Sequence, residues 1–538
     1  MTTHARAAAP VHAVRAVRAK LNVKPPIAGT IIFGFVLLIG IIYAAMSIHS
    51  DVSPVQATTK TPYILLGVAL LIALGFEFVN GFHDTANAVA TVIYTNSMEP
   101  HLAVVWSGLW NFLGVLTSSG AVAYGIIALL PAELILQSGG NAGFAMVFAL
   151  LIAAILWNLG TWYFGLPSSS SHTMIGSIIG VGIANQLMSP KSGTSGVDWN
   201  QALNIGRTLV LSPLFGFLLA LILLSVSKAL IKDKRLYQAP QGDEPPPIGI
   251  RAMLIATCTG VSFFHGSNDG QKGMGLIMLI LVGTVPTAYA LNHAVTDSQT
   301  IDFIAVSQQT AAVVNKYVSQ TADTKDSRAD LTDYIRTKEF TPYTTASLHK
   351  MILDIGAEMD TYRNLKNVPA NQVRNVRNDM YIVNESMRLM GKADNPHFSP
   401  EDLVVLENYK KHIGLATRFI PIWVKVAVAL ALSLGTMVGW KRIVVTVGEK
   451  IGKDHLTYAQ GAAAEITAMF AIGAADGLGV PVSTTHVLSS GVAGTMVANG
   501  SSLQMSTVRN LLLAWTLTLP ASVVLSGTLF WSFRAMGF

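Results

Sequence analysis

Long apolar runs restrict the fold of this chain more than any other feature. A helix needs about 20 apolar residues to cross a bilayer, and runs near that length recur throughout the sequence. They cover 27–48, 63–81, 102–123, 142–164, 173–187, 209–229, 253–264, 275–291, 420–440, 459–472, 487–498 and 511–531. Only 12% of the residues are charged, about half the fraction usual in soluble domains. Because lipid offers no hydrogen bonds to the backbone, such runs must form helices. The sequence therefore predicts an all-helical, multi-pass membrane protein with about ten to twelve spans.

Two short polar segments recur inside this apolar sequence. Each leads from a glycine and a proline through a run of hydroxyl residues to a histidine. Pro167 and Pro481 are 314 positions apart, as are His172 and His486. Proline after glycine is typical of a helix start, where free N–H groups and the helix dipole attract an anion. We therefore interpret the hydroxyls as an anion site made of Ser168, Ser169, Ser170, Ser171, Ser483, Thr484 and Thr485. Capping of the helices alone is the alternative.

A second repeat precedes the first in each half of the chain. Asp84 and Asp269 are 185 positions apart, in matching surroundings that contain phenylalanine and glycine. We interpret both segments as glycine-rich breaks in apolar helices, and a carboxyl group inside a membrane is a functional candidate because its charge is costly to bury. Each carboxyl could ligate a cation such as sodium, carry a proton or accept a hydrogen bond from a protonated oxyanion. A structural cap or a pair with Lys272 is the alternative.

Further polar residues near these segments extend the candidate site. Asn87 and Asn268 are candidate cation ligands, and Glu465 is a candidate coupling-ion residue, with a buried structural role as its alternative. In the second copy, Lys272 stands at the position that Asn87 occupies in the first copy. Lys272 either holds a substrate charge or neutralises Asp269.

The two repeats also divide the chain. The first 26 residues hold five basic side chains and no acidic one, which by the positive-inside rule places this tail in the cytoplasm. We expect a basic tail at 1–26, an extra span at 27–48, a first transport repeat at 62–230, a second at 250–291 and 418–538, and a soluble helical insert at 292–417. The side of the membrane on which the insert lies stays open.

Four motifs in this order, at 81–88, at 265–272 and in the two hydroxyl segments, resemble the paired signatures of the PiT family of inorganic phosphate transporters, in particular its bacterial low-affinity members. The resemblance implies two inverted repeats with broken or re-entrant helices, a dimer, and phosphate transport with a coupling cation. In bacterial members that cation is generally a proton, with divalent metal–phosphate complexes among the substrates, whereas other branches use sodium. The motif match assigns Asp84, Asn87 and Asp269 to the family's signature and the hydroxyls to its phosphate cradle.

Two departures from the family's commoner pattern bear on the coupling ion. His83 stands where that pattern has asparagine, and Gly270, Gln271 and Lys272 stand where it has Val-Ala-Asn. A sodium site needs several oxygen ligands, so the loss of amides favours a proton.

We expect a secondary transporter that imports inorganic phosphate by proton symport across a bacterial inner membrane, with no cofactor, no resident metal and no nucleic-acid partner. The alternatives are sodium coupling, another oxyanion such as sulfate, or a membrane enzyme. The enzyme is disfavoured because Ser171 and His172 are neighbours and do not face each other on a helix.

Overall fold

The computed structural model describes residues 18, 20–53, 61–130, 135, 140–188, 196–240, 243–319, 326–393 and 396–537. Within these ranges the chain is helical, and its one β feature is an isolated bridge between Gly452 and Leu503. The predicted all-helical fold is confirmed. Most of the basic tail lies outside the described residues, but Arg18 forms an ion pair of 2.5 Å with Glu449.

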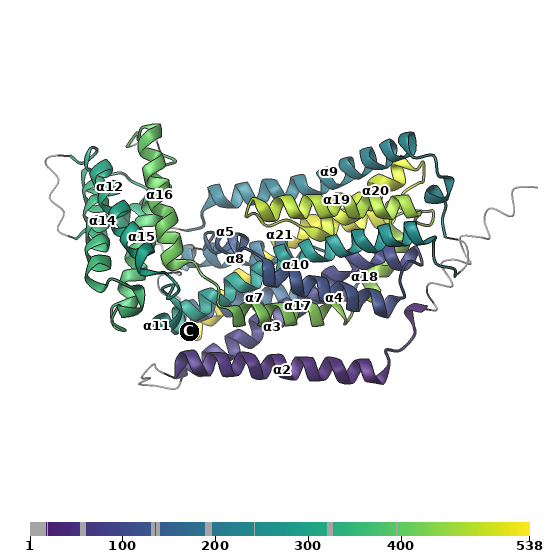
Figure 1. Cartoon of the computed structure of the whole chain (residues 1–538), viewed down its shortest axis with the longest axis horizontal. Coiled ribbons are helices and arrows are strands. Elements are labelled where there is room, and N and C mark those ends of the chain that lie inside the picture. The colour runs from purple at the N-terminus through teal and green to yellow at the C-terminus, as the bar shows by residue number, and fades with distance from the viewer. Residues whose placement is uncertain are drawn as a thin grey trace, which may run out of the picture.

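The helices outside the insert form one elongated bundle, with α2 along its edge (Figure 1). The first half contains α2 (Ile27–Val52), α3 (Thr61–Tyr94), α4 (Pro100–Thr117), α5 (Ala121–Ile127), α7 (Asn141–Tyr163), α8 (Ser170–Met188), α9 (Trp199–Leu230) and η1 (Lys234–Tyr237). The second contains α10 (Ile248–Thr284), α11 (Pro286–Tyr289), α17 (Ile422–Thr436), α18 (Lys441–Val445), η3 (Thr446–Lys450), α19 (Tyr458–Gly477), α20 (Thr484–Ala498) and α21 (Met505–Ala535).

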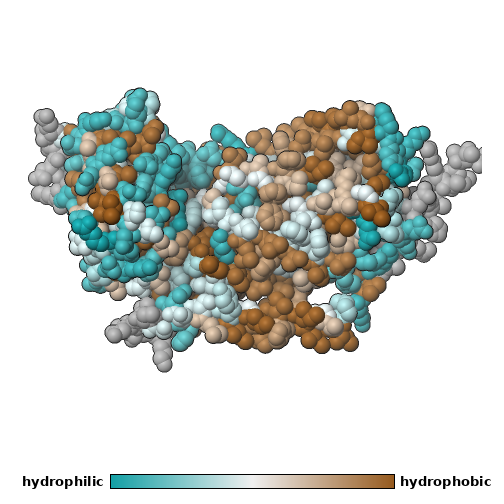
Figure 2. Space-filling view, in the orientation of Figure 1, coloured by the Kyte–Doolittle hydropathy of each residue, from teal (hydrophilic) through white to brown (hydrophobic). Residues whose placement is uncertain are grey.

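Between α11 and α17 lies a separate group of helices at one end of the long axis (Figure 1). It contains α12 (Asp297–Asn315), α13 (Ser327–Thr337), α14 (Pro342–Tyr362), η2 (Leu365–Asn367), α15 (Val373–Met390) and α16 (Pro400–Thr417). These helices share a hydrophobic core that includes Leu348, Val376 and Tyr409. Their surface is mostly hydrophilic, whereas the bundle is largely hydrophobic (Figure 2).

Six described helices are long and apolar enough to cross a membrane, or up to eight if each of two bent pairs counts as one span. The bends are 75° between α4 and α5 and 79° between α16 and α17. The expected ten to twelve spans are therefore not confirmed. The hydroxyl-bearing helices α8 and α20 are not among these helices, and α20 has only 15 residues. Both are buried among other helices along most of their length.

Helix α3 crosses α17 at two glycines that leave no room for a side chain. A Cβ on Gly81 would lie 2.1 Å from the carbonyl oxygen of Leu432, and a Cβ on Gly435 would lie 2.1 Å from that of Phe78. Small residues of this kind let helices in a membrane approach backbone to backbone.

The crossing of α10 with α4 repeats this arrangement. A Cβ on Gly266 would lie 2.2 Å from the carbonyl oxygen of Asn111, and one on Gly114 would lie 2.0 Å from that of Phe263. Gly266 follows Gly81 by 185 positions, the spacing of the acidic repeat. Helix α3 of the first half and helix α10 of the second half thus each cross a helix of the other half in the same way.

The glycines near the two acidic residues do not break the helices, and this prediction was wrong. Helix α3 continues through Asp84, and α10 continues through Asp269. The physical reason is that Gly81 and Gly266 serve the close helix crossings, while the i to i−4 hydrogen bonding of each helix continues past them.

Candidate functional site

The two hydroxyl segments follow the same local design. Gly165 and Gly479 adopt the left-handed conformation, with φ of +66° and +67°. Each ends the preceding helix, since Gly165 N–H donates to the carbonyl of Trp162 and Gly479 N–H to that of Asp476. Glycine is favoured at this position because it has no Cβ to clash.

The helices that follow begin with a serine cap. Ser169 Oγ accepts from the backbone N–H of His172 at 3.2 Å, and Ser483 Oγ accepts from that of His486 at 3.2 Å. Both serines satisfy N–H groups that the helix leaves unpaired. The hydroxyls of these two serines therefore cap the helices, which is the alternative role that the sequence left open for the hydroxyl segments.

The prolines lie outside the helices, contrary to the expected position in the first turn. Helix α8 begins at Ser170 and α20 at Thr484. Pro167 and Pro481 thus precede the cap residues by two positions. Their restricted backbone suits the extended segment that leads into each cap.

Asp84 joins the two hydroxyl segments. Ser170 Oγ donates to Asp84 Oδ2 at 2.8 Å, and Thr485 Oγ1 donates to Asp84 Oδ1. Ser170 Oγ is also 3.5 Å from Asp269 Oδ2. Hydroxyls that lie far apart in the sequence therefore meet at the acidic residues, inside the protein.

Lys272 and Asp269 form a buried ion pair beside this junction. Lys272 Nζ is 2.6 Å from Asp269 Oδ1, and neither side chain is exposed. The same ammonium donates to Ser171 Oγ at 2.6 Å, and Ser171 in turn donates to the carbonyl of Val482 at 2.8 Å. Lys272 thus contacts Asp269, the carboxylate that it was expected to neutralise in one of its two predicted roles.

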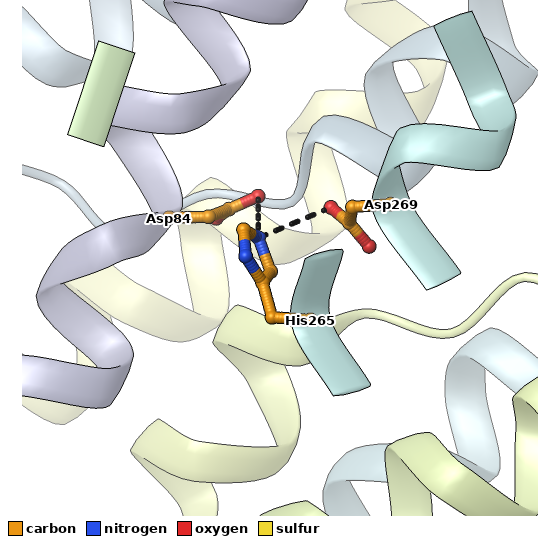
Figure 3. Close-up of side chains that lie close together, drawn as sticks. All are labelled: Asp84, His265 and Asp269. Atoms are coloured by element: carbon orange, nitrogen blue, oxygen red, sulfur yellow. Dashed lines mark ion pairs between the residues drawn. The ribbon is translucent and has the colours of Figure 1, made fainter. Parts of the chain in front are cut away.

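His265 lies between the two carboxylates, as Figure 3 shows. Its Nε2 is 3.5 Å from Asp269 Oδ2 and 3.9 Å from Asp84 Oδ2. Its Nδ1 is 2.6 Å from Oδ1 of Asn111. One ligand atom from each of Asp84, His265 and Asp269 lies within 4.8 Å of the others, a grouping that could hold a metal ion. The sequence reasoning left His265 unassigned, although its spacing of four residues from Asp269 places both on one helix face.

Several sequence-predicted residues lie beside the junction or away from it. Ser168 Oγ is 3.0 Å from Thr161 Oγ1, and Asn268 Nδ2 donates to the carbonyl of Val480 at 3.2 Å. Thr484 is buried. The side chain of Asn87 lies outside the described part of the chain.

Glu465 has hydrogen-bond partners outside the junction of Asp84 with the hydroxyl segments. It is fully buried on α19 and accepts hydrogen bonds from Thr91 of α3 and Thr257 of α10. These threonines connect three helices through one carboxylate, and the role of Glu465 as a coupling-ion residue stays a prediction.

Glu77 was missed by the sequence reasoning. Its side chain is fully buried on α3, seven positions before Asp84. Its Oε2 is 3.5 Å from Asn80 Nδ2, and its Oε1 has no hydrogen-bond partner. An acidic residue within the apolar run 63–81 was the signal that could have found it.

A multi-pass helical bundle with buried hydroxyl donors and carboxyl groups is typical of membrane transporters. A model of the phosphate transporter family matches residues 80–526, and this chain belongs to that family.

The chain is similar to two low-affinity inorganic phosphate transporters of Escherichia coli strain K12. It is 41% identical to PitB and 42% identical to PitA, and each match covers 87% of this chain and 96% of the relative. A probable low-affinity inorganic phosphate transporter of Bacillus subtilis is 28% identical over 86% of this chain and 96% of its own length.

One solved structure, described as "The sodium-dependent phosphate transporter", is similar in fold, with a TM-score of 0.50 and 19% identity. The match covers 88% of this chain and 100% of that one. The resemblance read from the four motifs is confirmed. The relatives are named as bacterial phosphate transporters and the chain has several apolar helices, findings that agree with a multi-pass protein of the inner membrane that is a transporter and not an enzyme.

Proposed function

We propose that this inorganic phosphate transporter binds phosphate where α3, α8, α10 and α20 meet, and imports it together with protons. The observation that carries the site is that Ser170 and Thr485, from the two halves of the chain, both donate to Asp84. Hydroxyls that can turn their donors towards a ligand suit the oxygens of a tetrahedral anion. The neighbouring carboxylates accept hydrogen bonds, so they favour a phosphate that still carries a proton over sulfate.

The surroundings of Lys272 support a proton over sodium as the coupling ion. Its ammonium already contacts oxygen atoms of Asp269 and Ser171 at 2.6 Å each. A sodium ion would need several such oxygens, and a fixed cation beside them repels it. Proton coupling needs only carboxyl groups that gain and lose protons, and Asp84 and Asp269 are the candidates at the site.

The packing of the last helices supports a fold of two related repeats, an architecture common in transporters that work by alternating access. Helix α21 packs on α8, and α9 packs on α20. A Cβ on Gly180 would lie 2.1 Å from the carbonyl oxygen of Val523, and one on Gly494 would lie 2.2 Å from that of Phe217. In both pairs, a late helix of one half packs in the same way on the hydroxyl-bearing helix of the other half. This is the arrangement expected of two related repeats. The inverted repeats, the domain boundaries and the dimer stay predictions.

A divalent metal that travels with phosphate is a second candidate substrate component. The observation that favours it is the group of Asp84, His265 and Asp269, whose ligand atoms converge. Carboxylate oxygens suit hard cations such as Mg²⁺, and an imidazole nitrogen adds a ligand for softer metals.

Uptake into proteoliposomes tests this proposal, with the pH gradient, sodium and magnesium varied independently. We expect phosphate to accumulate when the lumen is more alkaline than the outside, without a requirement for sodium. Asp84→Asn and Asp269→Asn variants should lose most of this uptake. Arsenate, but not sulfate, should compete. Undiminished gradient-driven uptake in both variants would contradict the proposal.

A further inference from the structure

We propose that Glu77 carries the co-transported proton, an inference that rests on the proton coupling proposed above. The carboxyl group binds a proton on the side from which phosphate enters and releases it on the other side. No covalent bond other than O–H forms or breaks.

The first argument is that Glu77 has the weakest donors among the buried carboxyls. Four acidic side chains are buried in the described helices of the bundle: Glu77, Asp84, Asp269 and Glu465. Asp84 accepts from two hydroxyls, Asp269 is paired with Lys272, and Glu465 accepts from two threonines. Glu77 has only a long contact from Asn80. An ionised carboxylate without donors is costly inside a membrane, so in this conformation Glu77 holds its proton.

The second argument is the position of Glu77 beside the phosphate site. A Cβ on Gly273 would lie 2.5 Å from Glu77 Oε1, so the carboxyl group rests against α10 next to Lys272. Glu77 also precedes Asp84 by seven residues, about two turns along one face of α3. It can therefore influence the site without occupying it.

The charged groups that face Glu77 come from α10 and are Asp269, Lys272 and His265. Two other helices that pack on α3 contribute little charge. Helix α7 has no charged residue, and α17 has only Lys425, which donates to the carbonyl of Ser118. Lys272 is thus the nearby ammonium group that an ionised Glu77 would attract.

This arrangement gives a physical link between proton release and the phosphate site. Glu77, Asp84 and Asp269 are three carboxyl groups against the one ammonium group of Lys272. When Glu77 loses its proton, its new charge draws Lys272 away from Asp269 and Ser171. The hydroxyl segment and Asp269 then lose their cation, and the affinity for the anion falls. Protonation of Glu77 restores it.

The test compares two modes of transport in Glu77→Gln, whose amide keeps the shape of the side chain but binds no proton. Accumulation driven by a pH gradient needs net proton movement, whereas exchange of labelled for unlabelled phosphate at equal pH does not. We expect Glu77→Gln to lose gradient-driven accumulation and to retain exchange, with a rate that depends on pH less than that of the wild type. Glu77→Asp should retain part of the accumulation.

Two results would overturn the inference. One is accumulation by Glu77→Gln at the wild-type level with the wild-type dependence on the gradient. The other is the loss of exchange together with accumulation in a variant that still inserts and folds, which would assign Glu77 to binding or packing. If the wild type itself ignores the pH gradient, the proposed coupling fails instead, so the two failures are distinguishable.

Discussion

Removal of the ammonium group of Lys272 tests the buried ion pair directly. Lys272→Met keeps an unbranched apolar stem of similar reach but leaves Asp269 without its cation. Both side chains are 0% exposed and their charged atoms are 2.6 Å apart. Breaking a fully buried pair by removing one partner typically destabilises a protein by about 3–5 kcal/mol, because the remaining charge is uncompensated. We expect a loss of this size.

The double variant Asp269→Asn/Lys272→Met separates the pair from the packing. Its amide is neutral and still offers an oxygen to Ser170, so most of the lost stability should return. The chain's single cysteine, Cys258, is buried, and a thiol-reactive fluorophore therefore reports thermal unfolding in detergent. Lys272→Met should unfold at a clearly lower temperature than the wild type. Equal unfolding temperatures for the wild type and Lys272→Met would refute the reasoning, as would a double variant no better than the single one.

Three further predictions concern the site, the helix crossings and the insert. Ser170→Ala and Thr485→Val each remove one donor to Asp84, so each should weaken phosphate uptake in proteoliposomes, and unchanged uptake would exclude these hydroxyls from the site. Gly266→Ala should reduce folded protein sharply because its Cβ meets backbone at 2.2 Å, whereas Gly75→Ala, with nothing within 4 Å, should behave as wild type in the same expression assay. Burial raises the pKa of Asp198, but the N–H of Gln201 and the guanidinium of Arg388 outweigh it and lower the pKa below 3.8. The ion pair of 2.6 Å between Asp198 and Arg388 connects the start of α9 to α15. Its stabilising effect should be complete above pH 3.8 and fade as the pH falls through the lowered pKa. Asp198→Asn should remove this part of the acid dependence of the unfolding temperature, and an unaltered acid dependence would contradict it.

Local signals in the sequence predicted the membrane fold and the residue types of the site. Spacing alone identified the duplicated hydroxyl segments, and the structure brings Ser170 and Thr485 together at Asp84. The same signals misplaced features that depend on packing. The glycines near Asp84 suggested a broken helix, yet they allow a helix crossing. The sequence also did not show that Glu465 of α19 accepts hydrogen bonds from threonines of two other helices.

By itself the sequence determined that this chain forms membrane helices, because hydropathy and the cost of an unpaired backbone in lipid act within one segment. It also determined which polar groups lie inside those helices and that they occur twice. Only the tertiary structure decided which of these groups are partners. Lys272 pairs with Asp269, Asp84 receives hydroxyls from both halves, and Oε1 of Glu77 is left without a donor. The physical reason is that these contacts join residues up to 401 positions apart, and they follow from how closely the helices cross.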